Sequence, residues 1–125
     1  MTIFQFTDAY GVRHLLSLEW ITSIEVQHNR NCPRYYEPNC GVLIYTVGDK
    51  EAKYVPVCRA IYERVLKGND DAYYALSKED QTKIRHENYE NSTRAMEEAI
   101  KKTNEFVDNL VELWQRCQLK ITKLN

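Results

Sequence analysis

Arginine, histidine, tyrosine and asparagine residues gather at a few places along this sequence. Arg13-His14 follows a turn, His28-Asn29-Arg30 and Arg34-Tyr35-Tyr36 lie close together, and a polar stretch runs from residue 85 to residue 94. Arginine binds phosphate oxygens through its forked donors, tyrosine stacks on bases, and asparagine pairs with the adenine edge. In combination, these residue types predict a binding site for a small nucleotide.

The stretch 85–94 carries the densest set of such side chains. On a helix, Arg85 and Tyr89 share one face, and Asn91 and Arg94 share another because they are three residues apart. Glutamates within the stretch dilute its positive field. We therefore expect a ligand with one or two phosphates rather than a long nucleic acid. The alternative is that these side chains are solvated and bind nothing.

The overall charge also argues against a long polyanion. Lys and Arg number 17 and Asp and Glu number 18, which gives a formal net charge of −1, whereas proteins that bind nucleic-acid backbones carry a basic excess. The sequence contains no nucleophile elbow, phosphate-binding loop or dinucleotide fingerprint. We therefore expect a binding protein that is not an enzyme and needs no cofactor.

The cysteines allow two alternatives to free thiols. Cys32 and Cys40 bracket a loop that a disulfide could close in an oxidising compartment, and His28, Cys32, Cys40 and Cys58 can be drawn as a zinc site. The paired ligand spacings typical of zinc sites are absent, so we expect no bound metal. The N-terminus lacks the features of a signal peptide, and no apolar run is long enough to cross a bilayer. This predicts a cytoplasmic protein outside the membrane.

The chain of 125 residues is long enough for one domain, and its first half is strand-like. Residues 3–7, 41–47 and 53–57 are rich in β-branched and aromatic residues, and Pro56 places the last strand at an edge. Between residues 14 and 26 the alternation breaks at Trp20-Ile21, which indicates a bulge or short helical step. We expect an antiparallel sheet over residues 1–57.

The second half, residues 58–125, is predicted to be helical, which makes the fold class α+β. Residues 59–67 carry helix-like apolar spacing and end at Gly68, a natural C-cap. A linker or short helix follows from residue 69. From Ser77 to about residue 120 nothing breaks a helix, and about 40 residues would span about 60 Å. The helix either breaks near residues 91–93 or projects and packs on another chain.

Residues 96–117 contain apolar side chains spaced alternately three and four apart, as in a heptad repeat. The repeat consists of Met96, Ala99, Thr103, Phe106, Leu110, Leu113 and Cys117. Four further apolar residues widen this stripe: Ile100, Val107, Val111 and Trp114. Such a broad face can pack on the chain's own sheet, on a second copy of the helix, or on both. We expect a homo-oligomer, dimeric or built from dimers, through residues 96–117.

The order of the elements resembles a known protein family. The N-terminal pattern consists of a strand, Gly11, Trp20-Ile21-x-x-Ile24-x-Val26, Val42-Leu43-Ile44-Tyr45-Thr46-Val47-Gly48 and Tyr54-x-Pro56-Val57. With about 60 helical residues after it, the whole chain resembles the phage Thoeris anti-defence sponge proteins of the first type. The resemblance implies an oligomer that sequesters cyclic ADP-ribose isomers without degrading them. Some members of the family also bind cyclic oligonucleotides at a separate site.

In that family, arginines, an asparagine and an aromatic ring hold the ligand. The resemblance, with the residue clusters above, gives a set of candidate ligand-binding residues: Arg13, His14, Arg30, Arg59, Arg85, Tyr89, Asn91 and Arg94. The implied setting is the cytoplasm of an infected host cell. The alternative function is a phage or bacterial protein-interaction module that inhibits or regulates a host protein through the tyrosine-rich loop Arg34-Tyr35-Tyr36, because tyrosine and arginine are enriched at binding hot spots.

Overall fold

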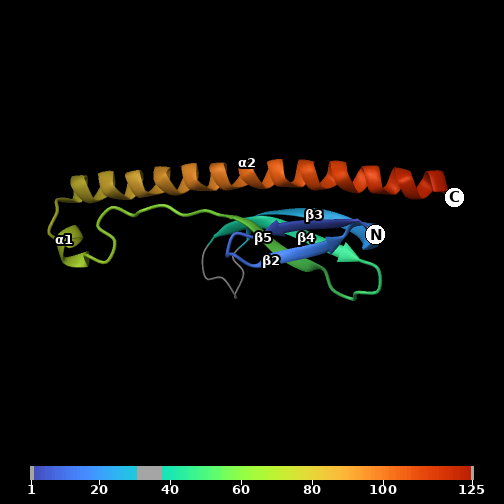
Figure 1. Ribbon diagram of the computed structural model, residues 1–125. Helices are drawn as coiled ribbons and strands as arrows, with labels where there is room; N and C mark the ends of the chain where they lie inside the picture. The colour runs from blue at the N-terminus through green and yellow to red at the C-terminus, as the bar shows by residue number, and fades with distance from the viewer. Residues whose placement is uncertain (1, 31–37, 125) are drawn as a thin grey trace.

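The computed structural model describes residues 2–30 and 38–124, with the backbone alone at 29, 30 and 122–124. The elements in chain order are β1 (Ile3–Thr7), β2 (Arg13–Ser17), a 3-10 helix η1 (Leu18–Trp20), β3 (Ile21–Arg30), β4 (Asn39–Thr46), β5 (Lys53–Arg59), α1 (Asp70–Tyr74) and α2 (Lys78–Leu124). Strands fill the N-terminal half and α2 dominates the C-terminal half (Figure 1). The predicted α+β class is therefore confirmed.

The strands form two antiparallel sheets. One has the order β1-β2 and the other the order β3-β4-β5. β5 is an edge strand, as Pro56 predicts, and the carbonyl of Pro56 accepts a 2.9 Å hydrogen bond from the amide of Ala9, which ties the two sheets together. The expected break at Trp20-Ile21 is the 3-10 helix η1, which separates β2 from β3.

One close approach in the larger sheet requires glycine. A Cβ atom added to Gly41 would lie 2.1 Å from the carbonyl oxygen of Val55, which is far inside van der Waals contact. The register of the β4–β5 ladder shifts between Cys40 and Gly41, so this is also where the two strands change alignment.

The main core lies between the sheets and the C-terminal part of α2. Leu18, Ile44, Val55 and Leu110 are almost completely buried there. Phe106 of α2 contacts two phenylalanines of β1, with ring centroids 5.9 Å from Phe4 and 4.8 Å from Phe6. Edge-on aromatic packing of this kind adds to the free energy of simple burial.

Residues 78–124 form one unbroken helix of 47 residues, about 70 Å long, which settles the choice between one helix and two. It begins as a capped helix, because the hydroxyl of Ser77 accepts a 3.1 Å hydrogen bond from the amide of Asp80. The heptad residues between 96 and 117 are buried or half-buried against the chain's own sheets, in two small clusters. The predicted oligomer stays a prediction, because these contacts lie within one chain.

We call residues 61–94 the arm and the remaining described residues the body. The arm consists of the chain from 61 to 69, α1 and the N-terminal part of α2, and it extends beyond the sheets (Figure 1). No residue described between 61 and 94 is buried, whereas the body holds all of the buried residues. The molecule thus has a packed part and a thin part, which are joined by α2.

The predicted helix over residues 59–67 is wrong. β5 continues to Arg59, and the chain then runs without helical structure to α1 at Asp70. The segment runs beside α2 instead, where the amide of Val65 donates a hydrogen bond to Asn88. Gly68 still has a positive φ of 77°, but it belongs to a turn rather than to a helix end.

Candidate functional site

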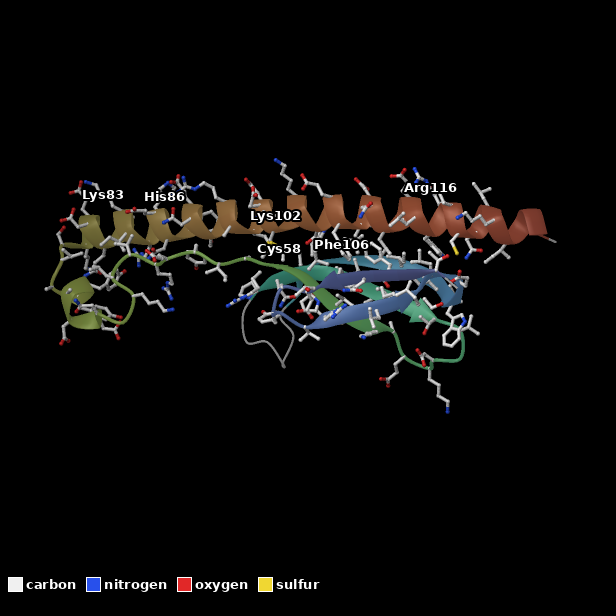
Figure 2. All side chains as sticks on the ribbon, viewed as in Figure 1. Cys58, Lys83, His86, Lys102, Phe106 and Arg116 are labelled. Carbon is white, nitrogen blue, oxygen red and sulfur yellow. The ribbon has the colours of Figure 1, made fainter. Side chains whose placement is uncertain are left out.

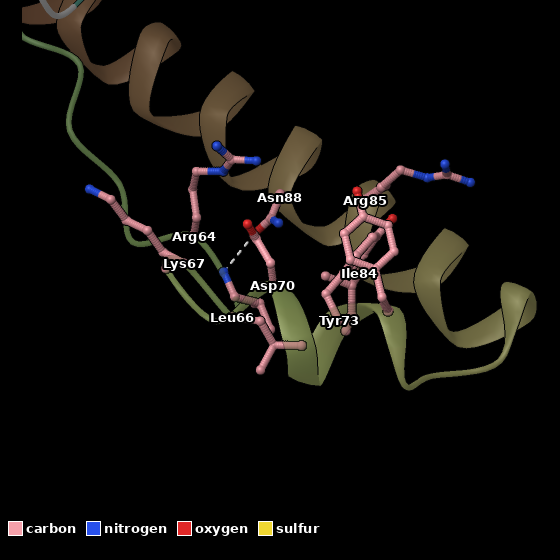
Figure 3. Close-up of a pocket in the computed structure, with 11 residues that line it drawn as sticks. Arg64, Leu66, Lys67, Asp70, Tyr73, Ile84, Arg85 and Asn88 are labelled. Atoms are coloured by element: carbon pink, nitrogen blue, oxygen red, sulfur yellow. Dashed lines mark hydrogen bonds between the residues drawn. The ribbon is translucent and has the colours of Figure 1, made fainter.

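An open cavity of about 280 Å³ lies in the arm, between residues 64–74 and the N-terminal turns of α2 (Figure 3). It is lined by Arg64, Val65, Leu66, Lys67, Gly68, Asp70, Tyr73, Tyr74, Ile84, Arg85 and Asn88. The lining comes from three segments of the chain that are brought together when the segment after β5 turns back at α1. Of the predicted ligand-binding residues, Arg85 lies here.

A single side chain fixes one wall of this cavity. The Oδ1 atom of Asn88 accepts a 2.7 Å hydrogen bond from the amide of Val65, which is drawn as a dashed line in Figure 3. The next residue, Leu66, has a φ of 59°, which is an unfavourable conformation for a bulky residue. The cavity wall is thus a strained turn that Asn88 holds against α2.

The floor of the cavity is aromatic and its rim is mostly cationic. Tyr73 is half-buried beside Ile84. The exposed side chains of Arg64, Lys67 and Arg85 line the rim, together with one carboxylate, that of Asp70 at the start of α1. Guanidinium and ammonium groups bind phosphate, an aromatic ring stacks on a base, and a carboxylate accepts hydrogen bonds from ribose hydroxyls.

A second, shallower hollow of about 260 Å³ lies further along α2. Tyr89, Glu90, Thr93 and Arg94 line it. The guanidinium of Arg94 donates a hydrogen bond to the side-chain oxygen of Asn91, so the predicted i, i+3 pairing of these two residues is confirmed. Tyr89 is 70% exposed. Arg85 and Arg94 are nine residues, or about 14 Å, apart along the helix, so one small ligand would not contact both.

The remaining candidates belong to the body, far from the cavity. His14 is buried in β2, where its Nε2 atom lies 2.8 Å from Oδ2 of Asp8 and its ring stacks on Phe6 at 5.0 Å. Arg13 is exposed at the start of β2. The guanidinium of Arg59 lies 5.0 Å from the centre of the Tyr10 ring.

The Asp8 carboxylate organises the turn between β1 and β2. Its Oδ1 atom accepts hydrogen bonds from the amides of Tyr10 at 2.8 Å and Val12 at 3.0 Å. Burial alone would raise the pKa of Asp8, but the hydrogen bonds from His14 and the two amides together lower it below its usual value. His14 therefore has a structural role as the partner of this carboxylate.

Two of the sequence predictions fall outside the described residues. One is the side chain of Arg30. The other is the loop that contains Cys32 and the tyrosine-rich segment Arg34-Tyr35-Tyr36. The disulfide and the zinc site that the sequence allows both include Cys32, so they too lie outside the described residues. In the part of the chain that the structure describes, no group of three or more His, Cys, Asp or Glu side chains is placed to hold a metal ion.

The cavity residues that sequence reasoning missed include Arg64, Lys67, Tyr73 and Asn88. Asn88 stands within the polar stretch that the sequence singled out, but nothing in its spacing shows that it would hold Val65. The other three come from the segment that was predicted to be helical and from the short helix after it.

Comparisons with known proteins give no further constraint. The chain matches no protein-family model, no curated protein and no solved structure. Among the described residues, no helix combines the length and the apolar composition that crossing a membrane requires.

Proposed function

We propose that this protein is a non-catalytic binding protein that sequesters a small cyclic nucleotide, either a cyclic ADP-ribose isomer or a cyclic oligonucleotide. By removing this signal in the cytoplasm of the host cell, it would suppress an anti-phage defence. The observation that carries the proposal is the arm cavity, which Arg64, Lys67 and Arg85 line together with the half-buried ring of Tyr73. The resemblance to the phage sponge proteins supplies the identity of the signal.

The cavity chemistry supports a nucleotide over other small anions. A phosphate would take the guanidinium groups, whose forked donors match its oxygens. A base would stack on Tyr73, and the Asp70 carboxylate is available to ribose hydroxyls. The volume of about 280 Å³ lies just below the usual range of about 300–1,000 Å³ for small-molecule pockets, so a cyclic nucleotide would extend out of this open cavity.

We also propose that the protein acts as a homo-oligomer. The chain exposes 8954 Å² of surface, whereas the usual scaling gives about 7000 Å² for a compact monomer of 14.8 kDa. The surplus of about 2000 Å² is comparable to what one chain contributes to a large permanent interface. The sequence predicts this interface at residues 96–117, but much of that stripe packs on the chain's own sheets, so we propose the surface of the arm, where no described residue is buried, as the interface instead.

Titration calorimetry with cyclic ADP-ribose isomers, cyclic dinucleotides and cyclic trinucleotides tests the binding proposal. We expect one of these to bind, and to be recovered chemically intact after the protein is denatured. Arg85→Ala and Arg64→Ala should each weaken binding by about tenfold or more, which corresponds to about 1.4 kcal/mol. Arg116→Ala is the matched control, because Arg116 is exposed on the body part of α2 and paired with Glu112 at 2.6 Å.

Two results would contradict the proposal. One is the absence of binding heat with every nucleotide from a protein that unfolds cooperatively. The other is equal binding by the Arg85→Ala and Arg116→Ala variants, which would place the ligand outside the arm cavity. Light scattering across a concentration series tests the oligomer separately, and a mass of one chain at all concentrations would contradict it.

A further inference from the structure

Two cysteines and one methionine from three elements belong to one small cluster where α2 crosses the edge of the larger sheet. Cys40 of β4 and Cys58 of β5 are direct partners in the antiparallel ladder, and Met96 comes from α2. The Sγ atom of Cys40 lies 3.5 Å from the Sδ atom of Met96. The chain has only four cysteines and two methionines, so this cluster holds half of its sulfur atoms.

The two thiols face the same side of the sheet. Side chains of directly opposed residues in an antiparallel ladder share a face, with Cβ atoms about 4.5–5.5 Å apart. Cys40 and Cys58 both belong to the small apolar cluster beneath α2 that also contains Met96, and both are free thiols. Figure 2 shows Cys58 at the junction between the sheet and α2.

We propose that Cys40, Cys58 and Met96 form a binding site for a soft monovalent metal ion, Cu(I), with three sulfur ligands. Thiolate and thioether sulfurs are the ligands that select Cu(I) over harder ions. Bonds from a metal ion to thiolate sulfur are about 2.3 Å long, so two ligand sulfurs on one ion lie within about 4.6 Å of each other. The 3.5 Å between Cys40 and Met96 meets that condition.

The surroundings of the three sulfurs favour Cu(I) over zinc. A structural zinc site is tetrahedral and takes four nitrogen, oxygen or thiolate ligands. The other members of this cluster carry only hydrocarbon side chains: Ala60, Ala95, Ala99 and Ile100. A site with two thiolates and one thioether in an apolar setting therefore offers the low coordination that Cu(I) accepts.

The exposure of Cys58 and the charges near the sulfur atoms also favour Cu(I) binding. Cys40 is fully buried, but Cys58 is half-buried at the sheet edge and would meet the ion first. The positive charge of Lys102 and the negative charge of Glu98 both act on the Cys58 thiol, which also donates a 3.6 Å hydrogen bond to the carbonyl of Arg59. Two thiolates and one Cu(I) carry a net charge of −1, which the ammonium of Lys102 offsets, although Lys102 also lies 3.8 Å from Glu98.

The site can be tested on the full chain without any nucleotide, so its outcome is independent of the proposed function. The reduced protein is titrated with Cu(I) against the chelator bicinchoninate under argon. We expect one Cu(I) per chain, with a thiolate-to-copper charge-transfer band in the ultraviolet. Failure to retain Cu(I) against the chelator would overturn the proposal, as would a Cys40–Cys58 disulfide in protein isolated without oxidant.

Single substitutions locate the ligands. Met96→Leu keeps the volume of the side chain and removes only the sulfur, and we expect it to weaken Cu(I) binding by about tenfold. Cys58→Ser should weaken binding by about a hundredfold, and Cys40→Ser as well if this buried variant folds. Cys117→Ser is the matched control, because Cys117 is a buried free thiol of the other core cluster. Cys32→Ser is a second control.

The variants leave two clear outcomes. Cu(I) affinity that falls in Met96→Leu and Cys58→Ser but stays within twofold of the original in both controls supports the site. Affinity that is unchanged in Met96→Leu and Cys58→Ser, or that is lost in Cys117→Ser or Cys32→Ser, would overturn it. Circular dichroism of each variant confirms that the loss is not caused by unfolding.

Discussion

All of the fully buried apolar side chains among the described residues belong to the body of this protein, and none belongs to the arm. In the body, both sheets and the C-terminal part of α2 enclose residues such as Leu18 and Leu110, which are 1% and 0% exposed. In the arm, α2 is accompanied only by a non-helical segment and the five residues of α1. The same helix therefore serves as a core element at one end and as a nearly solvated element at the other.

This difference indicates that the body stabilises the fold, whereas the arm carries the candidate binding site. Buried apolar area is the main source of folding free energy, so the body supplies most of the stability. Residues that bind ligands are often drawn from less stable parts of a fold, and here the cavity with Arg64, Tyr73 and Arg85 belongs entirely to the arm. The sulfur cluster, by contrast, sits in the body, close to where the arm begins.

Truncating the core should have the largest effect on stability. Leu110→Ala removes a fully buried side chain at the centre of the main core, and we expect the free energy of unfolding to fall by about 2–5 kcal/mol. Tyr89→Ala, at a 70% exposed position of the arm, should change it by no more than about 0.5 kcal/mol. Chemical denaturation measures both, at a protein concentration where light scattering gives the mass of one chain. Similar losses in the two variants would contradict the contrast between arm and body.

Hydrogen exchange compares the two ends of α2 within one molecule. We expect amides around residues 80–92 to exchange about a hundredfold faster than those around residues 103–113, since local opening of the arm exposes little apolar surface. A hundredfold difference corresponds to about 2.8 kcal/mol. The measurement is made at low protein concentration. Equal protection there would contradict the contrast between arm and body.

Acid should destabilise the body through Asp8. The pKa of Asp8 is lower in the folded chain than its usual value, so its contribution to stability is present above about pH 3.9 and is lost as the pH falls through the folded pKa. Asp8→Asn should lower the free energy of unfolding at pH 7 by about 1.5–3 kcal/mol, because it removes a buried, charged hydrogen-bond acceptor.

Denaturation at a series of pH values tests the assignment to Asp8. The difference between the original protein and the Asp8→Asn variant should shrink as the pH falls below 3.9, because protonation then removes the same charge. A difference that stays constant down to pH 2 would mean that the ionisation of Asp8 does not matter to the fold.

Among the substitutions expected to destabilise the protein, the one at the cavity wall should have the smallest effect. Asn88→Ala removes the acceptor for the amide of Val65 and should cost about 1 kcal/mol, whereas Asn88→Asp keeps an acceptor and should cost less. Both substitutions leave every cation of the cavity in place. Calorimetry should therefore show weaker nucleotide binding in Asn88→Ala if this hydrogen bond positions the wall, whereas Asn88→Asp restores the acceptor but adds a negative charge beside the proposed phosphate site.

Much of the fold could be predicted because its signals are local. The β-branched run at residues 41–47, the break at Trp20-Ile21 and the cap at Ser77 each depend on neighbouring residues. The segment 59–67 was predicted wrongly because its apolar spacing suits a helix equally well. What decides its conformation is contact with α2, including the hydrogen bond from Val65 to Asn88, and such long-range contacts leave no local pattern.

The candidate site was predicted less completely for the same reason. Arg85 was found because it stands in a dense run of binding-type residues. His14 fits the chemistry of a ligand site, but the structure pairs it with Asp8 in the body. Arg64 and Lys67 join Arg85 only because the chain turns back at α1, a tertiary event that spacing along the sequence does not reveal.

Because α2 is one unbroken helix, it holds the arm cavity and the sulfur cluster at a fixed separation. Asn88 at the cavity and Met96 at the sulfur cluster are eight residues apart on the same continuous helix, so the helical rise separates them by about 12 Å along its axis. Neither place can approach the other unless the helix bends or melts between them. Anything held in the arm is therefore presented at a fixed spacing and a fixed angular phase from the body, with no hinge between the two.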